Sequence, residues 1–106
     1  SSISVHTGYK GLAMYASSKG ALEAFSKDTA REWGPMGIRS NVVVPGFMAT
    51  AMSSTLTDDQ RNKIYARTSL KAATSIRSVA ETVAFLLSEK AESITGQNIH
   101  VDNGTI

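Results

Sequence analysis

Side chains at helical spacing mark the segment 13–33, which contains no proline and one glycine. The recurring positions are Ser18, Leu22, Phe25, Thr29 and Trp33, with Ala21, Ala24 and Ala30 beside them. This period predicts an amphipathic helix that ends at Gly34-Pro35-Met36-Gly37. We expect Phe25 and Trp33 to be packing residues of this helix.

Three stretches have the pattern of strands. Asn41-Val42-Val43-Val44 is a β-branched run without alternation, typical of a strand covered on both faces in a parallel sheet, and Pro45-Gly46 ends it. The opening residues Ser1–Val5 alternate between polar and apolar, as the end of a strand does. Residues 97–101 predict a short strand, and Val101-Asp102-Asn103-Gly104 predicts the turn after it.

Two further helices and a loop complete the predicted elements. Thr57-Asp58-Asp59 signals the start of a helix that runs to about Thr68. Ser75 can cap a second helix, 75–87. The apolar stripe of that helix consists of Ile76, Val79, Val83 and Leu86. Residues 6–12 contain two glycines and predict a loop.

The order strand-end, helix, strand, helices, strand predicts an α/β fold with parallel pairing. Two strands and part of a third make an incomplete sheet, because the strand at Val42–Val44 needs neighbours on both edges. The chain begins at Ser1 rather than Met, and no turn or cap precedes the strand end. We therefore interpret the start as cut from something longer, the C-terminus as natural, and 1–106 as a single partial domain.

Composition narrows the function classes. The chain has 106 residues, 42% of them hydrophobic, with 11 Lys and Arg against 9 Asp and Glu and no Cys. The absence of Cys excludes a disulfide scaffold and a cysteine nucleophile. The small net charge favours neither nucleic acid nor membrane as a partner, and no apolar run is long enough for a membrane span. His6 and His100 have no second ligand at a useful spacing, so no metal site is expected. A cytoplasmic protein is the default expectation.

The candidate chemistry centres on Tyr15 and Lys19, four residues apart near the start of the long helix. That spacing places both side chains on one face. An ammonium beside a phenol stabilises the phenolate, so we expect a lowered phenol pKa and proton exchange with a carbonyl or alcohol oxygen. The alternative is a chance pair on a helix surface, where this spacing is common.

Two further features of the sequence strengthen the interpretation of Tyr15 and Lys19 as a catalytic pair. Ser2 lies at the end of the first strand, where its hydroxyl can bond a substrate oxygen; the alternative is one hydroxyl in a serine-rich strand end. The stretch from Pro45 to Thr50 follows the buried strand at its carboxyl end, where parallel sheets bind ligands. Gly46 would let a flat ring approach the backbone. Thr50 offers a hydroxyl to a ligand, or else caps the short segment after it.

With these elements in view, the sequence resembles the short-chain dehydrogenase/reductase family in its compact form. The matching motifs are Ser1-Ser2-Ile3-Ser4, Tyr15-Ala16-Ser17-Ser18-Lys19-Gly20-Ala21, Gly37-Ile38-Arg39-Ser40-Asn41-Val42, Pro45-Gly46 with Thr50, and Ile94-Thr95-Gly96-Gln97 leading to Val101-Asp102-Asn103-Gly104. They span essentially the whole chain in family order. The branch that the sequence resembles most is the β-ketoacyl-acyl-carrier-protein reductases. The resemblance implies the C-terminal half of a doubly wound parallel, Rossmann-type sheet.

The resemblance also implies roles. Tyr15 would be the general acid in carbonyl reduction and the base in alcohol oxidation, with NAD or NADP as the cofactor. Lys19 would acidify Tyr15 and hold the nicotinamide ribose, and Ser2 would polarise the substrate carbonyl. The backbone at Pro45, Gly46 and Met48 would hold the nicotinamide end, together with the Thr50 hydroxyl.

Other implications concern the remaining segments. The segment from Met52 to Leu70 would be a substrate lid, with Met48 and Met52 at the pocket. Part of the long helix would pack on a partner subunit, giving a homo-oligomer, a dimer or a tetramer. In the family, the Gly-rich dinucleotide loop, the NAD-or-NADP selector and a catalytic Asn precede the part that matches residue 1.

This chain departs from the family pattern at two places. Asn103 stands where the family often has Gly, and Lys71-Ala72-Ala73 replaces a Gly-containing stretch. Neither departure is expected to affect catalysis directly. Two alternatives to the oxidoreductase remain open. One is a truncated, non-catalytic fragment that cannot bind cofactor alone and folds by oligomerisation. The other is an epimerase or dehydratase of the same superfamily, which shares the Tyr/Lys pair.

Overall fold

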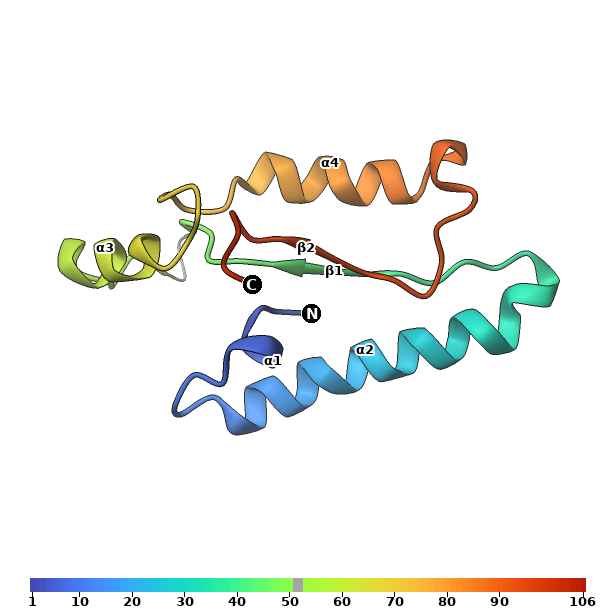
Figure 1. The fold of residues 1–106 in the computed structure, drawn as a ribbon, viewed down its shortest axis with the longest axis horizontal. Helices are drawn as coiled ribbons and strands as arrows, with labels where there is room; N and C mark the ends of the chain where they lie inside the picture. The colour runs from blue at the N-terminus through green and yellow to red at the C-terminus, as the bar shows by residue number, and fades with distance from the viewer. Residues whose placement is uncertain (51–52) are drawn as a thin grey trace.

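The computed structural model describes residues 1–50 and 53–106 and contains a two-stranded parallel sheet (Figure 1). Strand β1 (Val42–Pro45) pairs with β2 (Asn98–Val101) over its whole length. Parallel strands need a long crossover connection, which the chain between β1 and β2 provides. The predicted α/β class with parallel pairing is confirmed.

Helices cover the strands from two sides. The helices of the described residues are α1 (Ser4–Thr7), α2 (Ala13–Trp33), α3 (Asp58–Ala66) and α4 (Ile76–Leu86), with 3-10 turns η1 (Gly34–Met36) and η3 (Glu89–Ala91). Figure 1 shows α4 on one side of the strands and α2 on the other. Both α2 and α4 contact β1, the strand with the larger buried share. The three longer helices confirm the predicted ranges to within about two residues at each end.

The helix starts follow the predicted caps. The Thr57 side chain accepts a hydrogen bond from Gln60 N, and the Gln60 side chain accepts one from Thr57 N, which makes a capping box at the start of α3. At the start of α4, Ser75 Oγ accepts from Ser78 N. Each cap satisfies backbone donors that lack a partner within the helix, so these local signals were sufficient to place both helix starts.

The first residues lie along the free edge of β1. Ser1 N donates to Val43 O at 3.0 Å and Ile3 N donates to Pro45 O at 3.3 Å, the even spacing of a parallel ladder. These two bonds do not make residues 1–5 a strand: Ile3 already has helical backbone angles and the sheet of the described residues consists of β1 and β2, so the strand predicted over 1–5 is not formed. From Ser4 the chain turns into α1, because Ser2 Oγ accepts from Ser4 N and bends the backbone there. The predicted loop over 6–12 accordingly starts at Gly8.

The side of α2 that faces the sheet is built from small residues. Ser26 and Ala30 are its buried positions, and Ser26 Oγ hydrogen-bonds Ser40 Oγ at 2.8 Å. Phe25 is 71% exposed and Trp33 is 48% exposed. These two predicted packing residues therefore do not pack against the sheet of this chain, because small side chains bring the helix against β1 and leave both rings exposed.

The core is small for the length of the chain. The buried apolar residues are Ala30, Val42, Val44, Leu86 and Ala91. The radius of gyration is 15.2 Å, against about 13 Å for a compact domain of this length. Large apolar side chains on α2 and α4 remain at the surface. The described residues thus form a sheet with flanking helices whose apolar side chains are only partly buried.

The two departures from the family pattern coincide with left-handed backbone. Lys71 has a φ of 56° and Asn103 a φ of 54°, a conformation that glycine adopts at the lowest cost. Asn103 compensates with its side chain, since Nδ2 donates to Ala72 O at 2.9 Å and to Ala73 O at 3.0 Å. The two unusual segments therefore hold one another in place.

This contact gives a stability prediction. In the natural polypeptide that carries this sequence, Asn103→Ala is expected to lower the free energy of unfolding by about 2 kcal/mol, because it removes both hydrogen bonds and keeps a Cβ in the left-handed conformation. Asn103→Gly removes the same bonds without that strain and is expected to cost about half as much. Urea unfolding measures both. Equal losses in the two variants would contradict the argument from backbone conformation.

Candidate active site

Tyr15 and Lys19 share one face of α2 in its first two turns. Lys19 Nζ lies over the Tyr15 ring, 5.6 Å from the ring centroid, which is within the range of a cation–π contact. The Tyr15 side chain is not sealed into the core, since the residue is 48% exposed. The phenol is thus both close to a positive charge and open to a ligand.

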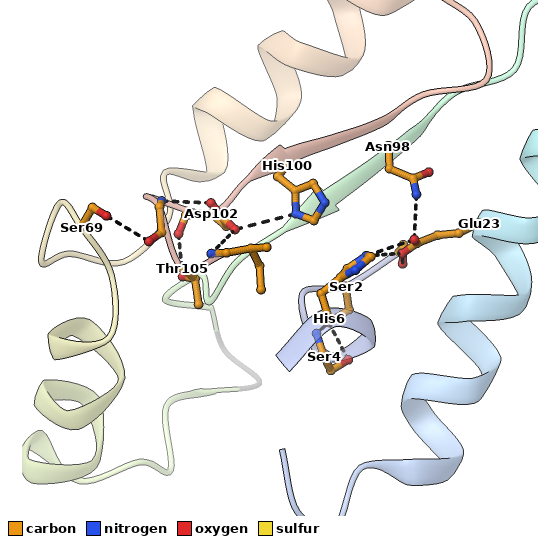
Figure 2. Close-up of polar contacts among 12 residues, drawn as sticks. Ser2, Ser4, His6, Glu23, Ser69, Asn98, His100, Asp102 and Thr105 are labelled. Atoms are coloured by element: carbon orange, nitrogen blue, oxygen red, sulfur yellow. Dashed lines mark hydrogen bonds and ion pairs between the residues drawn. The ribbon is translucent and has the colours of Figure 1, made fainter. Parts of the chain in front are cut away.

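Ser2 is held with its hydroxyl hydrogen available. Ser2 Oγ accepts hydrogen bonds from Ser4 N at 3.2 Å and from Ser4 Oγ at 2.9 Å (Figure 2). Since both contacts use the oxygen as acceptor, the Ser2 hydrogen remains free to donate. Ser4 itself is buried, which fixes this small turn against the rest of the molecule.

A cavity of about 500 Å³ lies beyond the carboxyl end of β1 and brings most of the predicted residues together. Among the residues that line it are Ser2, Tyr15, Gly46, Met48 and Thr50. Two predicted residues are not among its lining. They are Lys19, whose ammonium lies over the ring of the lining residue Tyr15, and Pro45, whose carbonyl accepts the hydrogen bond from Ile3 N. The site is at the edge of the sheet where parallel α/β folds bind ligands.

Several lining residues were not singled out in the sequence. Ile3, Leu12 and Phe47 contribute apolar surface, and Leu56 and Ile64 do so from the segment predicted as a lid. Met52 of that segment lies outside the described residues. Tyr9 and Arg67 also line the cavity, with the Arg67 guanidinium 5.1 Å from the Tyr9 ring centroid. Residues so far apart in sequence meet only through the fold, so no local pattern could have paired them.

The structure shows a second reason for glycine at position 46, in addition to the predicted one. A Cβ at Gly46 would lie 2.6 Å from Thr74 Oγ1 and 2.8 Å from Asp102 Cα. The packing of the neighbouring chain segments therefore requires glycine here, and the approach of a flat ring to this backbone stays a prediction. Thr50 also has a local partner, since its N–H donates to Ser53 Oγ at 2.9 Å.

A second polar cluster adjoins the site on α2. The Glu23 carboxylate accepts hydrogen bonds from Ser1 Oγ at 2.5 Å and from Asn98 Nδ2 at 2.8 Å, and it bonds His6 Nε2 at 3.0 Å (Figure 2). The rings of His6 and His100 meet edge to face, with centroids 4.9 Å apart. No local sequence pattern indicates this cluster, because its members come from three separate segments: residues 1–6, α2 and β2.

Residues 1–105 match the family model described as enoyl-(acyl carrier protein) reductase. The chain belongs to the short-chain dehydrogenase/reductase family. The resemblance to this family noted in the sequence is thereby confirmed.

Curated relatives and a solved structure agree with this assignment, and the relatives confirm the predicted likeness to the β-ketoacyl-acyl-carrier-protein (3-oxoacyl-acyl-carrier-protein) reductases. The 3-oxoacyl-(acyl-carrier-protein) reductase of Salmonella typhimurium is 44% identical over 97 residues, which are 92% of this chain and 40% of the relative. That of Staphylococcus epidermidis is 40% identical over the same share. A solved 4-hydroxyisoleucine dehydrogenase in complex with NADH superposes with a TM-score of 0.94 at 28% identity, covering 99% of this chain and 44% of that one.

The matched part of each relative shows that this chain corresponds to less than half of a family member. The chain spans about two fifths of the length of the curated relatives it matches. Its two-stranded parallel sheet with flanking helices is part of a Rossmann-type α/β fold, as predicted. Among the helices of residues 1–50 and 53–106, none combines the length and apolar character needed to cross a membrane.

Proposed function

We propose that the natural polypeptide that carries this sequence is an NAD(P)(H)-dependent oxidoreductase that reduces a carbonyl compound or oxidises the matching alcohol. The observation that supports this most is the shared cavity of Tyr15 and Ser2, with the Lys19 ammonium 5.6 Å from the Tyr15 ring centroid. Two hydroxyls at one cavity, one of them beside a positive charge, are suited to bind and protonate a carbonyl oxygen.

Each residue has a defined part in this proposal. The Ser2 hydroxyl donates a hydrogen bond to the substrate oxygen, because its own oxygen already accepts from Ser4. The Tyr15 hydroxyl transfers its proton to that oxygen in reduction and takes it back in oxidation. The Lys19 ammonium stabilises the phenolate that remains. A nicotinamide cofactor, when bound, supplies or accepts the hydride.

The residues around the cavity fit the nicotinamide end of such a cofactor. Gly46, Met48 and Thr50 follow β1 at its carboxyl end and line the cavity, and they offer backbone groups and a hydroxyl. The Lys19 ammonium, which lies over the Tyr15 ring, has hydrogen-bond donors for ribose hydroxyls. The NADH complex of the superposed dehydrogenase supports this class of cofactor. NAD and NADP are both compatible with these residues.

The walls of the cavity favour a small carbonyl substrate with an apolar body. Ile3, Leu12 and Phe47 face it, and the relatives named as 3-oxoacyl-(acyl-carrier-protein) reductases support a ketone of the acyl class. Leu56 and Ile64 line the cavity from the segment proposed as the substrate lid.

The test is an assay of the natural polypeptide with 3-oxoacyl thioesters and either NADH or NADPH. The expected result is oxidation of one cofactor molecule for each carbonyl reduced. An epimerase or a dehydratase would convert its substrate without net consumption of cofactor, so the stoichiometry separates these readings. Absence of cofactor oxidation across a panel of ketones would refute the proposal.

For the 106-residue polypeptide by itself, we propose weak or absent cofactor binding and self-association. The small buried core and the exposed apolar side chains support this hypothesis of a fragment that associates with itself. Titration of residues 1–106 with NADPH, followed by fluorescence, is expected to show no saturation. Saturable binding at micromolar concentration would contradict it.

The exposed face of α2 gives a prediction for the oligomer. We propose a homodimer or homotetramer in which Phe25 and Trp33 lie at an interface, because both rings are exposed on the helix. Phe25→Asp is expected to shift the natural polypeptide to a lower oligomeric state in analytical ultracentrifugation. Arg31→Gln, an exposed change on another face of the same helix, is the control. An unchanged state in Phe25→Asp would exclude this face.

A further inference from the structure

We propose that Glu23 is a positioning residue that fixes Ser2 relative to Tyr15 and Lys19; this inference depends on the proposed function. Glu23 lies four residues after Lys19 and eight after Tyr15, so the three side chains form one stripe along α2. The Glu23 side chain is 10% exposed. A carboxylate buried to this degree costs free energy unless several donors satisfy it, and here three donors do so.

Two of the three donors flank Ser2 in the sequence. Ser1 Oγ lies 2.5 Å from Glu23 Oε2, and His6 Nε2 lies 3.0 Å from Oε1 and 3.2 Å from Oε2 (Figure 2). Ser1 Oγ also lies 3.4 Å from the Lys19 carbonyl oxygen. The short segment that contains Ser2 is thus attached to α2 on both sides, and the attachment point is one helical turn from Lys19.

The third donor ties the same carboxylate to the sheet. Asn98 Nδ2 donates to Glu23 Oε1 at 2.8 Å, and Asn98 is the first residue of β2. The backbone of residues 1–3 is in turn bonded to β1 through Val43 O and Pro45 O. Glu23 therefore connects the three parts on which the geometry of the site depends: the Ser2 segment, the helix with Tyr15 and Lys19, and the sheet.

Loss of the carboxylate should affect the chemical step more than the binding of cofactor. Ser2 must donate to the same oxygen that Tyr15 protonates, and misplacement by about 1 Å is enough to cost up to about a hundredfold in rate. In Glu23→Ala we expect kcat to fall about tenfold, with the KM for the cofactor unchanged. Glu23→Gln keeps one acceptor oxygen, so it should recover part of this loss. Glu32→Gln is the matched control, an exposed carboxylate elsewhere on α2.

A double-variant cycle separates positioning from general stability. If Glu23 acts through Ser2, then Glu23→Ala reduces kcat in the wild-type background and has little further effect in Ser2→Ala. A merely structural role predicts additive losses, and additive losses, or an unchanged kcat in Glu23→Ala, would overturn the inference.

Hydrogen exchange of the natural polypeptide supplies a readout that needs no activity. Glu23→Ala should raise the exchange rate of the Ile3 and Ser4 amides, while Glu32→Gln leaves it unchanged. If Glu23→Ala raises exchange at the Ile3 and Ser4 amides but the wild type has no reductase activity, the proposed function fails while the attachment by Glu23 stands. If exchange at these amides is unchanged in Glu23→Ala, the inference fails whatever the activity.

Discussion

Tyr15→Phe is expected to reduce kcat of the natural polypeptide by roughly a thousandfold, the size of effect typical of a lost general acid or base. The change removes one oxygen from a side chain that lines the cavity and leaves the ring under Lys19 Nζ. Phenylalanine keeps the apolar and cation–π contacts of that ring. The loss should therefore appear in the chemical step, measured as oxidation of NADH or NADPH in the presence of a 3-oxoacyl thioester.

The matched control is Tyr65→Phe. Tyr65 lies on α3, and its ring is 6.1 Å from that of Phe47, so the control removes a phenol oxygen close to the site but not at the cavity. Its turnover should stay close to that of the wild type. Cofactor affinity, measured separately by fluorescence titration, should be similar in all three proteins. Turnover of Tyr15→Phe at the wild-type rate would refute the role given to this residue.

The helices were predictable because their signals are local. The capping residues Thr57 and Ser75 act on backbone N–H groups only three residues away, so the sequence alone places the starts of α3 and α4. Tyr15 and Lys19 are likewise one helical turn apart, and their shared face follows from helix geometry. The parallel pairing of β1 followed from its unbroken valine run.

The features that could not be predicted depend on segments distant in sequence. Periodicity identified a stripe containing Phe25, but it did not show which side of the helix faces the sheet. That side is set by small residues such as Ala30, which fit against β1. The donors to Glu23 come from residues 1, 6 and 98, and no spacing rule connects them. The steric need for glycine at position 46 was not predicted either, because the contacting residues, Thr74 and Asp102, come from two later segments of the chain.

Gly46→Ala is expected to lower the free energy of unfolding by about 3 kcal/mol, the upper part of the range for an overpacked core. The added Cβ would lie 2.8 Å from the Asp102 backbone and 2.6 Å from Thr74 Oγ1. Such distances are too short for real contacts, so the turn after β1 must move. Gly46 N donates to Val101 O at 2.9 Å, and this movement would strain that bond between the two strand ends. Urea unfolding of the natural polypeptide measures the loss.

Two further variants make this prediction specific. Gly20 lies within α2, and a Cβ there would be 3.6 Å from Val5 Cγ1, an ordinary contact distance. Gly20→Ala should therefore stabilise the protein by up to about 1 kcal/mol, because alanine has the higher helix propensity. Thr74→Ala removes a buried hydroxyl that has no hydrogen-bond partner among the described residues, so it should cost little alone. The double variant Gly46→Ala/Thr74→Ala should recover part of the stability that Gly46→Ala loses. Thr74→Ala removes the clash of the new Cβ with Thr74 Oγ1, while the clash with Asp102 remains. Wild-type stability in Gly46→Ala would show that this turn has room for a side chain, and the packing argument would then fail.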